Sequence, residues 1–435
     1  MLKISVFEEY EHYLRSLRER GEIFEIPEEG ESQSENAEGQ RKRWMVTTYP
    51  AILQALGDPA LSSDRSTIFK LNDPALSSDR STIEEIKSIL SNTLITRDDN
   101  EHKELRERYV KAFNSCFTRD YDLGLRTLLA QEAERLIQRA QKQDEIDILK
   151  EFARPLVSYL NLKLLGVNEC QKQQFEEGLK KVASMLPGNS FVKENVDQGV
   201  EGALKLKKIF KEAIKEHQKG KTKNDLLGSF LESMEGLERS KLIDRSLGLC
   251  FLLVSATEGV VNLIGNGTLA LLLYPLELQK LKKDPQLISS AVNELLRFIP
   301  PVEHLLRVAK HPTRIAGRKI EEGDVVILNL GVANHYNDHI PFPDQLNIER
   351  KYHLVFGYGL HECLGQNLAR LVGEVTINSL LGKGDSLKLN IVPNKRSQWL
   401  QYPRQHNGLR GLDSLPVKFV SKDSTSAAWI DPAWA

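Results

Sequence analysis

The sequence predicts a mainly helical α+β fold, and two observations carry this prediction. From about Glu101 to Gln286, apolar residues recur at spacings of three and four with few prolines, which is typical of amphipathic helices. Beyond Pro300-Pro301, short β-branched runs alternate with glycine turns, which is typical of strands. A long run of helices followed by a few strands indicates an α-rich α+β architecture.

Length and composition are those of an ordinary globular chain. Of the 435 residues, 40% are hydrophobic and 27% are charged, so the chain is long enough to bury a cofactor and an apolar pocket. The net charge of -1 gives no reason to expect a nucleic acid or an anionic membrane as a partner. The N-terminus has no apolar run long enough for a signal peptide or a membrane anchor, so we expect a soluble, cytoplasmic protein.

The cysteines are spread along the chain. Cys116, Cys170, Cys250 and Cys363 include no CxxC pair. Neither a zinc site nor a disulfide framework is therefore indicated, and we expect reduced thiols.

The first hundred residues hold one strand candidate and one direct repeat. Residues 1–43 form a variable segment, and its polar part, residues 28–43, is typical of a surface loop. Trp44–Tyr49 has strand character. The segment DPALSSDRSTI occurs at Asp58–Ile68 and again at Asp73–Ile83. One direct repeat is too few for a solenoid, so we interpret it as a local duplication that lengthens a loop.

The middle of the chain predicts helices over Leu105–Phe113, Leu123–Gln141, Asp147–Leu165 and Leu204–His217. Leu242–Leu273 is the longest candidate and is apolar on nearly every face. A helix of this kind must be buried on most sides, so we expect it to run through the centre of the molecule.

The last third predicts short strands over Arg307–Ala309, Arg314–Ile320 and Asp324–Leu330, with Gly317 and Gly323 as turn residues. A final strand pair is expected near Leu409–Val420. The tail, residues 421–435, is expected to be loose.

The most informative stretch is FGYGLHECLGQNLAR at Phe356–Arg370. Gly357 and Gly359 allow backbone conformations that other residues avoid. Cys363 follows them at the predicted start of a helix from Leu364, where the helix dipole and backbone N–H groups favour thiolate over thiol. A permanent thiolate needs a cation, and a ferric haem supplies one. The alternative is a structural cysteine beside a glycine turn.

This stretch resembles the cytochrome P450 haem loop, FxxGxxxCxGxxLA. It matches at Phe356, Gly359, Cys363, Gly365, Leu368 and Ala369, with His361 and Arg370 as in the bacterial members. The resemblance implies one cytochrome P450 domain over residues 1–435, a helical prism with small β-sheets. It also implies that Cys363 is the axial ligand of haem b and that Phe356 packs near it.

Two further motifs support the resemblance. Glu294 and Arg297 are three residues apart, a spacing that alone indicates a surface ion pair. As the ExxR signature of the family, they imply a buried structural charge network behind the cysteine loop. The remaining matches imply haem-propionate ligands at His102, Arg106, Arg307 and His353.

The segment that resembles the helix over the haem departs from the family. The usual acid is present as Glu258, but Gly259 stands where the family has a threonine and Ala256 where it has a glycine. In the family, that threonine hydroxyl helps to deliver protons for O₂ cleavage and the acid feeds protons from solvent. Thr257 lies two residues along the helix and is rotated away by about 200°. Ser255, a bound water or a substrate hydroxyl therefore remains to replace the threonine.

The sequence leaves three functions open. The first is a monooxygenase that hydroxylates or epoxidises an apolar or mixed-polarity small molecule in specialised metabolism. The second is an atypical member that performs oxidative coupling, desaturation, rearrangement or peroxide-driven chemistry, because Gly259 replaces the threonine. The third is a non-catalytic haem carrier or sensor.

Position along the chain indicates pocket and partner residues. The pocket candidates are Ser255, Ala256, Gly259, Val260, Val302–Leu306 and Gln401–Leu409, with Glu303 and His304 either contacting a polar substrate group or facing water. No flavin or reductase segment is visible, so we expect electrons from a separate donor, a ferredoxin with its reductase. Arg350 and Lys351 are candidates for a basic face toward that donor.

Overall fold

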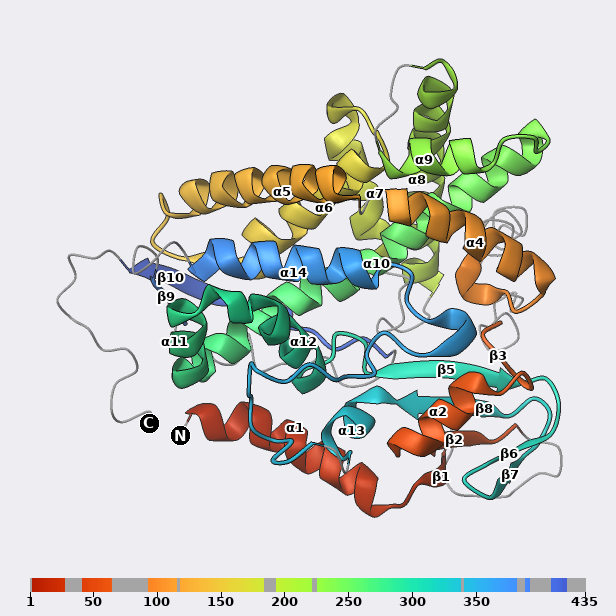
Figure 1. Cartoon of the computed structure of the whole chain (residues 1–435), viewed down its shortest axis with the longest axis vertical. Helices are drawn as coiled ribbons and strands as arrows, with labels where there is room; N and C mark the ends of the chain where they lie inside the picture. The colour runs from red at the N-terminus through yellow and green to blue at the C-terminus, as the bar shows by residue number, and fades with distance from the viewer. Residues whose placement is uncertain are drawn as a thin grey trace.

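The structure is a computed structural model that describes residues 2–27, 41–64, 93–115, 118–183, 193–220, 225–337, 340–381, 388–391 and 408–420. Helices dominate it, as predicted (Figure 1). They are α1 (Leu2–Glu19), α2 (Tyr49–Gly57), α4 (Asn100–Ser115), α5 (Arg119–Ala140), α6 (Arg154–Leu164), α7 (Lys172–Ala183), α8 (Lys193–Gln218), α9 (Leu226–Ser233), α10 (Arg239–Leu273), α11 (Pro275–Lys283), α12 (Ile288–Phe298), α13 (Leu330–His335) and α14 (Gln366–Leu381). Short 3-10 segments are η1 (Leu94–Thr96), η3 (Glu169–Gln171), η4 (Pro285–Leu287) and η5 (Gly359–His361), and η2 (Ile148–Ala153) is a π-helix.

Helix α10 is the longest described helix and runs through the centre of the molecule, in contact with α14 (Figure 1). The prediction of a buried central helix is confirmed. Its length and apolarity are sufficient to cross a membrane, but 67% of its most apolar stretch is buried inside the protein. We conclude that α10 is a core helix.

The strands form small sheets beside the helices. The five-stranded sheet has the order β1 (Ile23–Ile26), β2 (Arg43–Val46), β8 (Val325–Asn329), β5 (His304–Ala309) and β3 (Leu61–Ser62). A three-stranded sheet has the order β4 (Ile146–Asp147), β10 (Pro416–Val420) and β9 (Lys388–Ile391), and β6 (Thr313–Ile315) pairs with β7 (Arg318–Ile320). In the larger sheet β2 and β8 are parallel, and the other pairs are antiparallel.

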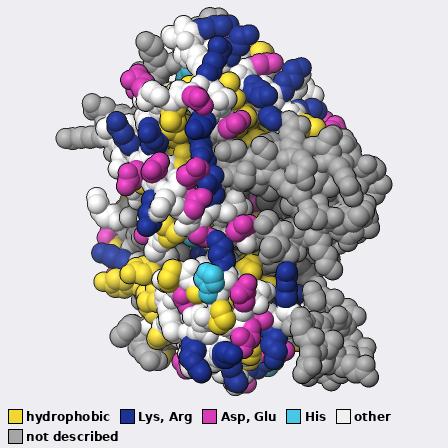
Figure 2. Space-filling model, turned by 90° about the vertical axis from the view of Figure 1, so that its right-hand side faces the viewer, with side chains coloured by type: hydrophobic (Ala, Val, Ile, Leu, Met, Phe, Trp, Pro, Cys, Tyr) yellow, Lys and Arg dark blue, Asp and Glu magenta, His cyan; other side chains and the backbone are white. Residues whose placement is uncertain are grey.

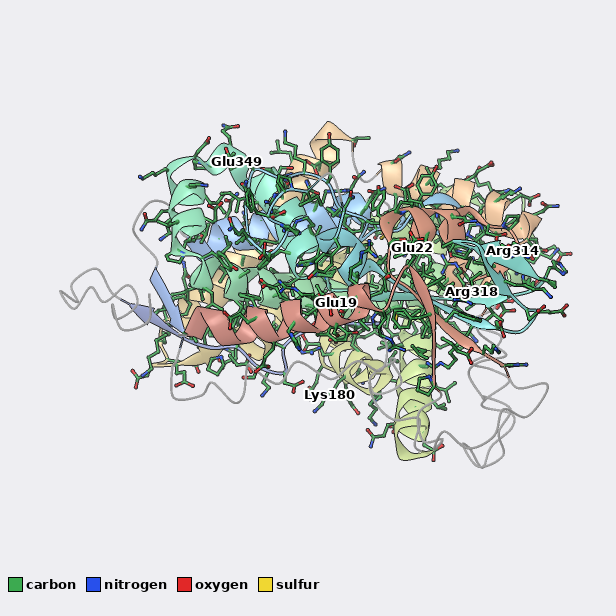
Figure 3. The ribbon with its side chains drawn as sticks, turned by 90° about the horizontal axis from the view of Figure 1, so that it is seen from below. Glu19, Glu22, Lys180, Arg314, Arg318 and Glu349 are labelled. Atoms are coloured by element: carbon green, nitrogen blue, oxygen red, sulfur yellow. The ribbon has the colours of Figure 1, made fainter. Side chains whose placement is uncertain are left out.

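The five-stranded sheet lies at the lower right of Figure 1, and β9 and β10 lie at the left. Seen from below, α1 runs along the underside with Glu19 near its end, and Arg314 and Arg318 mark the β6–β7 hairpin at the far end (Figure 3). The largest apolar core fills the space between the helices, and a second core lies between α2 and the sheet. The cysteine loop, residues 356–365, passes between these two regions.

Three predicted elements differ from the structure at their ends. The predicted strand Trp44–Tyr49 stops at Val46, because Pro50 suits the first turn of a helix and α2 begins at Tyr49. The predicted helix Asp147–Leu165 is interrupted, since Asp147 belongs to β4 and its side chain accepts from the N–H of Leu149 at the start of the π-helix. The helix after Cys363 begins at Gln366 rather than at Leu364.

The direct repeat is described in part. Leu61 and Ser62 of the first copy form β3, which pairs with β5, so this copy adds a strand to the sheet. The second copy, residues 28–40 and the tail from residue 421 lie outside the described residues. Near the predicted final strand pair, β10 pairs with β9, while Leu409 forms a bridge to Val302.

Candidate functional site

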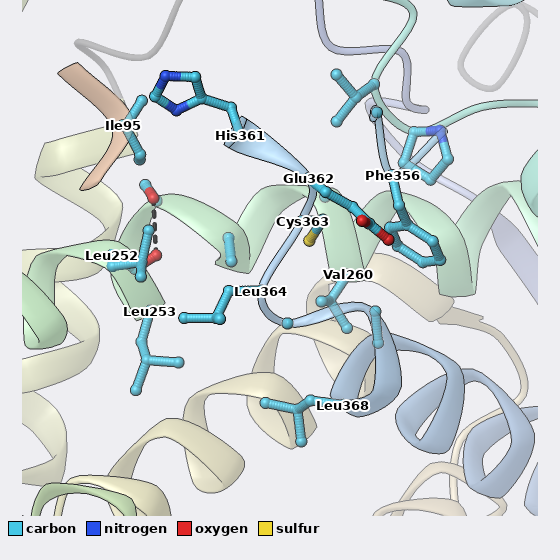
Figure 4. Close-up of a pocket in the computed structure, with 18 of the residues that line it drawn as sticks. Ile95, Leu252, Leu253, Val260, Phe356, His361, Glu362, Cys363, Leu364 and Leu368 are labelled. Carbon is cyan, nitrogen blue, oxygen red and sulfur yellow. Dashed lines mark hydrogen bonds between the residues drawn. The ribbon is translucent and has the colours of Figure 1, made fainter. Parts of the chain in front are cut away.

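A mainly apolar cavity of about 360 Å³ lies between α10 and the cysteine loop (Figure 4). This volume falls within the range of small-molecule sites in proteins, which is roughly 300 to 1,000 Å³. The walls come from α4, α6, α10, α14, β5 and the cysteine loop. Segments that are far apart in the sequence therefore meet at one site.

The cysteine loop is held by its backbone. Gly357 and Gly359 have φ angles of +70° and +77°, the left-handed region that glycine tolerates best. The N–H of Cys363 donates to the carbonyl oxygen of Phe356 at 2.8 Å and closes the loop. The sulfur and the Phe356 ring both face the cavity (Figure 4), and the guanidinium of Arg370 lies 4.6 Å from the centre of that ring.

Burial dominates the electrostatics of the thiol. It raises the pKa of Cys363, although the N–H of Gly365 and the charges of Arg106 and Arg370 act in the opposite direction. The backbone N–H of Gly365 thus favours the thiolate, as predicted for this loop, but desolvation of the buried sulfur outweighs it. Loss of the proton from the Cys363 thiol therefore requires a bound cation, because a metal ion binds cysteine as the thiolate.

His102 gives the clearest evidence that the site fits a haem. Its side chain is fully buried and lines the cavity, yet neither ring nitrogen has a hydrogen-bond partner among the described residues. Burial, together with the charges of His361 and Arg106, lowers the pKa of His102 to about 4. Buried polar atoms require partners, and the carboxylate of a bound haem would provide one for His102.

The other predicted propionate ligands fall into two groups. Arg106 and Arg307 line the cavity, and each also donates to a backbone carbonyl oxygen, that of Glu362 at 2.8 Å and that of Leu306 at 2.9 Å. His353 does not line the cavity. Its Nε2 contacts Oδ1 of Asn293 at 3.1 Å, and burial lowers the pKa of His353 to about 3.

His361 lies at the cavity edge where the sequence analysis expected His353. It lines the cavity, and its ring centre lies 4.8 Å from that of His102. The signal was present in the loop motif, where His361 stands two residues before the cysteine. Spacing alone did not show which of the two rings turns inward.

Glu294 and Arg297 form a fully buried pair, with contacts of 2.7 and 2.9 Å. Arg297 also donates to the carbonyl oxygens of Asn334 and Pro343, at 3.1 and 2.9 Å. Arg350 joins the network through Oε1 of Glu294 at 3.1 Å. The Arg350 side chain is 16% exposed, so this predicted residue of a basic face is anchored to Glu294 at the surface.

Helix α10 presents Ser255, Ala256, Gly259 and Val260 to the cavity, as predicted from position. The hydroxyl of Ser255 donates to the carbonyl oxygen of Leu252 at 2.7 Å, the dashed line in Figure 4. A Cβ added at Gly259 would meet nothing within 4 Å. The cavity therefore has open space where the family places a threonine.

Two neighbours of this face differ from expectation. Glu258 does not line the cavity but is ion-paired with Arg154 of α6. Thr257 was expected to point away from the site, but it lines the cavity. Its hydroxyl oxygen accepts a hydrogen bond from Nδ2 of Asn161 at 2.9 Å. The cavity extends around α10 toward α6, which the rotation argument did not consider.

The segment after Pro301 contributes apolar groups to the cavity. Val302 and Leu305 line it. His304 does not, because its ring contacts Nδ2 of Asn329 at 2.9 Å. Glu303 is buried and paired with Arg410 at 2.7 Å, so it neither contacts the cavity nor faces water. Of the predicted turn, Leu409 lines the cavity, and residues 401–407 lie outside the described residues.

A cysteine thiol, a buried histidine without partners and two arginines around one cavity define a site for a haem with thiolate ligation. Comparison with known proteins agrees with this class. A family model described as Cytochrome P450 matches residues 277–383. The chain is 32% identical over 379 residues to the polyketide biosynthesis cytochrome P450 PksS of Bacillus subtilis (strain 168), covering 86% of this chain and 88% of that protein.

Two further similarities extend over most of the chain. It is 29% identical over 378 residues to 6-deoxyerythronolide B hydroxylase of Saccharopolyspora erythraea, covering 86% of this chain and 90% of that protein. The solved structure of P450BioI in complex with an acyl carrier protein ligated to hexadec-9Z-enoic acid matches with a TM-score of 0.77 at 26% identity, covering 95% of this chain and 99% of that chain.

This chain belongs to the cytochrome P450 family. It is thus an oxidoreductase of the haem-dependent monooxygenase class, and the predicted fold is confirmed.

Proposed function

We propose that this chain is a cytoplasmic monooxygenase that takes electrons from a separate ferredoxin and its reductase and hydroxylates or epoxidises an apolar or mixed-polarity small molecule of specialised metabolism. One observation carries the proposal. A mainly apolar cavity holds the Cys363 thiol, the α10 face around Gly259 and the His102 ring, whose nitrogens have no hydrogen-bond partner among the described residues. Bound through Cys363, haem b supplies the reductive activation of O₂.

The residues of the chain bind and orient the cofactor and the substrate. Cys363 donates its sulfur and releases its proton when the metal binds. His102, Arg106 and Arg307 line the cavity and would offer N–H donors to the two propionate carboxylates of the haem. Carboxylates need such donors when they are buried. The apolar wall of α10 around Val260 binds the substrate and excludes water from the cavity.

The supply of protons is the part in which this chain departs from its family. Gly259 brings no hydroxyl, so we infer that a water molecule or a substrate hydroxyl occupies the open space beside it. Arg154 has a side chain that is 47% exposed and is paired with Glu258, so this ion pair connects solvent with α10. The hydroxyl of Ser255 donates its hydrogen to the carbonyl oxygen of Leu252. Its oxygen can still accept a hydrogen bond from that water or hydroxyl.

For the substrate class we propose an acyl chain, presented by a negatively charged carrier protein. P450BioI has been seen with an acyl-loaded carrier protein, and PksS is named for polyketide biosynthesis. The apolar lining of the cavity suits an aliphatic chain. On α8, Lys208, Lys211 and Lys215 have no ion-pair partner among the described residues and line a shallow hollow.

Figure 2 shows lysine and arginine side chains gathered at the top of the side on which α8 and α9 lie in Figure 1. The opposite face of α8 packs on α10, where the rings of Phe210 and Phe251 lie 5.5 Å apart. Phe251 directly precedes Leu252 of the cavity wall. An acidic partner held by the α8 lysines would therefore rest on the helix layer that covers the site.

The test is a spectrum followed by turnover. Reduced holoprotein under carbon monoxide should show the long-wavelength Soret band typical of thiolate ligation, and Cys363→Ser should lose it. With ferredoxin, ferredoxin reductase, NADPH and ¹⁸O₂, we expect label in hexadec-9Z-enoic acid presented free or on an acyl carrier protein. Product without label, or turnover with hydrogen peroxide alone, would favour the atypical oxidation. Haem binding without turnover would favour a carrier or sensor.

A further inference from the structure

One carboxylate joins three elements at the edge of the cavity. Asp98, two residues before α4, is hydrogen-bonded to Nε2 of His361 at 2.8 Å, to the N–H of Ser63 at 3.1 Å and to Nζ of Lys310 at 3.0 Å. The hydroxyl of Ser62 donates to it as well. These donors come from the cysteine loop, from the region of β3 and from the residue after β5.

The charge of Asp98 is held in place by these donors. Burial raises the pKa of Asp98, but the hydrogen bonds from His361, Ser62 and Lys310 outweigh burial and keep the pKa well below its ordinary value. The side chain is 19% exposed, so solvent screens its charge only in part. A carboxylate accepts and does not donate, which fixes Nε2 of His361 as an N–H.

His361 carries this contact to the cavity. Its ring lines the cavity beside His102, whereas Asp98 itself does not reach the lining. We propose that Asp98 is a positioning residue for the haem, which holds the His361 ring against His102 and places a fixed negative charge next to the cavity edge. The proposal rests on the haem site assigned above.

A charge beside a haem acts on the balance between its oxidised and reduced forms. A negative charge stabilises the oxidised iron, which is more positive, and so lowers the reduction potential. Asp98→Asn keeps the shape and removes the charge, so the midpoint potential should shift to more positive values. Lys310→Met removes the opposing positive charge and should shift the potential in the negative direction. That second shift should be smaller, because Lys310 is 49% exposed.

The experiment compares the holoproteins of wild type, Asp98→Asn, Lys310→Met and Ser62→Ala, the last of which removes one hydrogen bond without changing charge. Midpoint potentials are measured by spectroelectrochemistry, and haem retention by transfer to excess apomyoglobin. We expect potential shifts of opposite sign for Asp98→Asn and Lys310→Met, a potential near that of wild type for Ser62→Ala, and faster haem transfer from Asp98→Asn.

Shifts in the same direction, or a potential of Asp98→Asn equal to that of wild type, would overturn the positioning role. If Asp98→Asn yields no folded protein, the sign of the Lys310→Met shift decides alone. The carbon monoxide spectrum of the wild type separates this role from the haem site itself, since a wild type without the thiolate band would refute the site rather than the role of Asp98.

Discussion

Gly259 lies where the cytochrome P450 pattern has a threonine, and the space around it is open. Nearby hydroxyls are engaged elsewhere: Ser255 donates to Leu252, and Thr257 is bonded to Asn161 and the carbonyl oxygen of Leu253. The helix therefore offers no free hydroxyl proton among these residues, and proton delivery depends on what occupies the space beside Gly259.

We predict that Gly259→Thr raises the yield of product per NADPH several-fold and lowers the release of hydrogen peroxide. The Cβ of the added side chain meets nothing within 4 Å, and threonine restores a hydroxyl. Gly259→Val has the same shape without the hydroxyl and should not improve the yield. The measurement is NADPH consumed, peroxide released and product formed. Equal effects of the two substitutions would show that filled volume matters and the hydroxyl does not.

Single residues also mark what the sequence could and could not predict. The glycines of the cysteine loop were predictable, because the motif requires positive φ angles and the structure has them. The sequence placed His353 at the cavity, but His361 lines it instead, since distance along the chain does not give the direction of a side chain. The prediction that Glu303 contacts the substrate or faces water was wrong for a similar reason. Its partner Arg410 is far away in sequence, so no local pattern predicts the pair.

At the scale of elements, the buried network behind the cysteine loop joins α12 to the segment that follows α13. Glu294 sits at its centre, because it binds Arg297, Arg350 and the N–H of Asn347. The ExxR spacing could predict the pair but not its third member. That arginine follows an irregular segment whose course the sequence does not reveal.

Glu294→Gln should destabilise the holoprotein by about 3 to 5 kcal/mol, because it leaves the buried Arg297 without a counter-charge. Urea unfolding followed by circular dichroism would measure the change. The matched control is Glu321→Gln, which breaks the exposed pair with Lys319 and should change the stability by less than about 1 kcal/mol. A similar small loss in both variants would argue against a stabilising role for the buried pair.

At the scale of the whole molecule, helices α8 and α11 lie far apart (Figure 1). We predict that Lys211→Glu with Lys215→Glu weakens binding of an acyl-loaded carrier protein at least ten-fold, while the affinity for the free acid stays the same. Lys280→Glu with Lys283→Glu on α11 is the control and should change neither. Both affinities follow from the Soret shift on titration, and equal weakening by the two pairs would point to net charge rather than to a docking face.

The direct repeat can be tested on the same scale. Deleting residues 65–79 joins Asp64 to Arg80 and leaves one intact copy, including Ser62 and Ser63 beside Asp98. We expect full haem content and a thermal midpoint within a few degrees of wild type, because loop length costs little free energy. Loss of haem in the shortened chain would show that the second copy does more than lengthen a loop.

The open space beside Gly259 also bears on how substrates are selected. A ligand that brings its own hydroxyl there completes the catalytic apparatus, whereas an equally tight ligand without one leaves the reducing equivalents to be lost as peroxide. Selection among bound molecules then takes place after binding, as a difference in the chemistry achieved per electron. Affinity and turnover would rank a series of substrates in different orders.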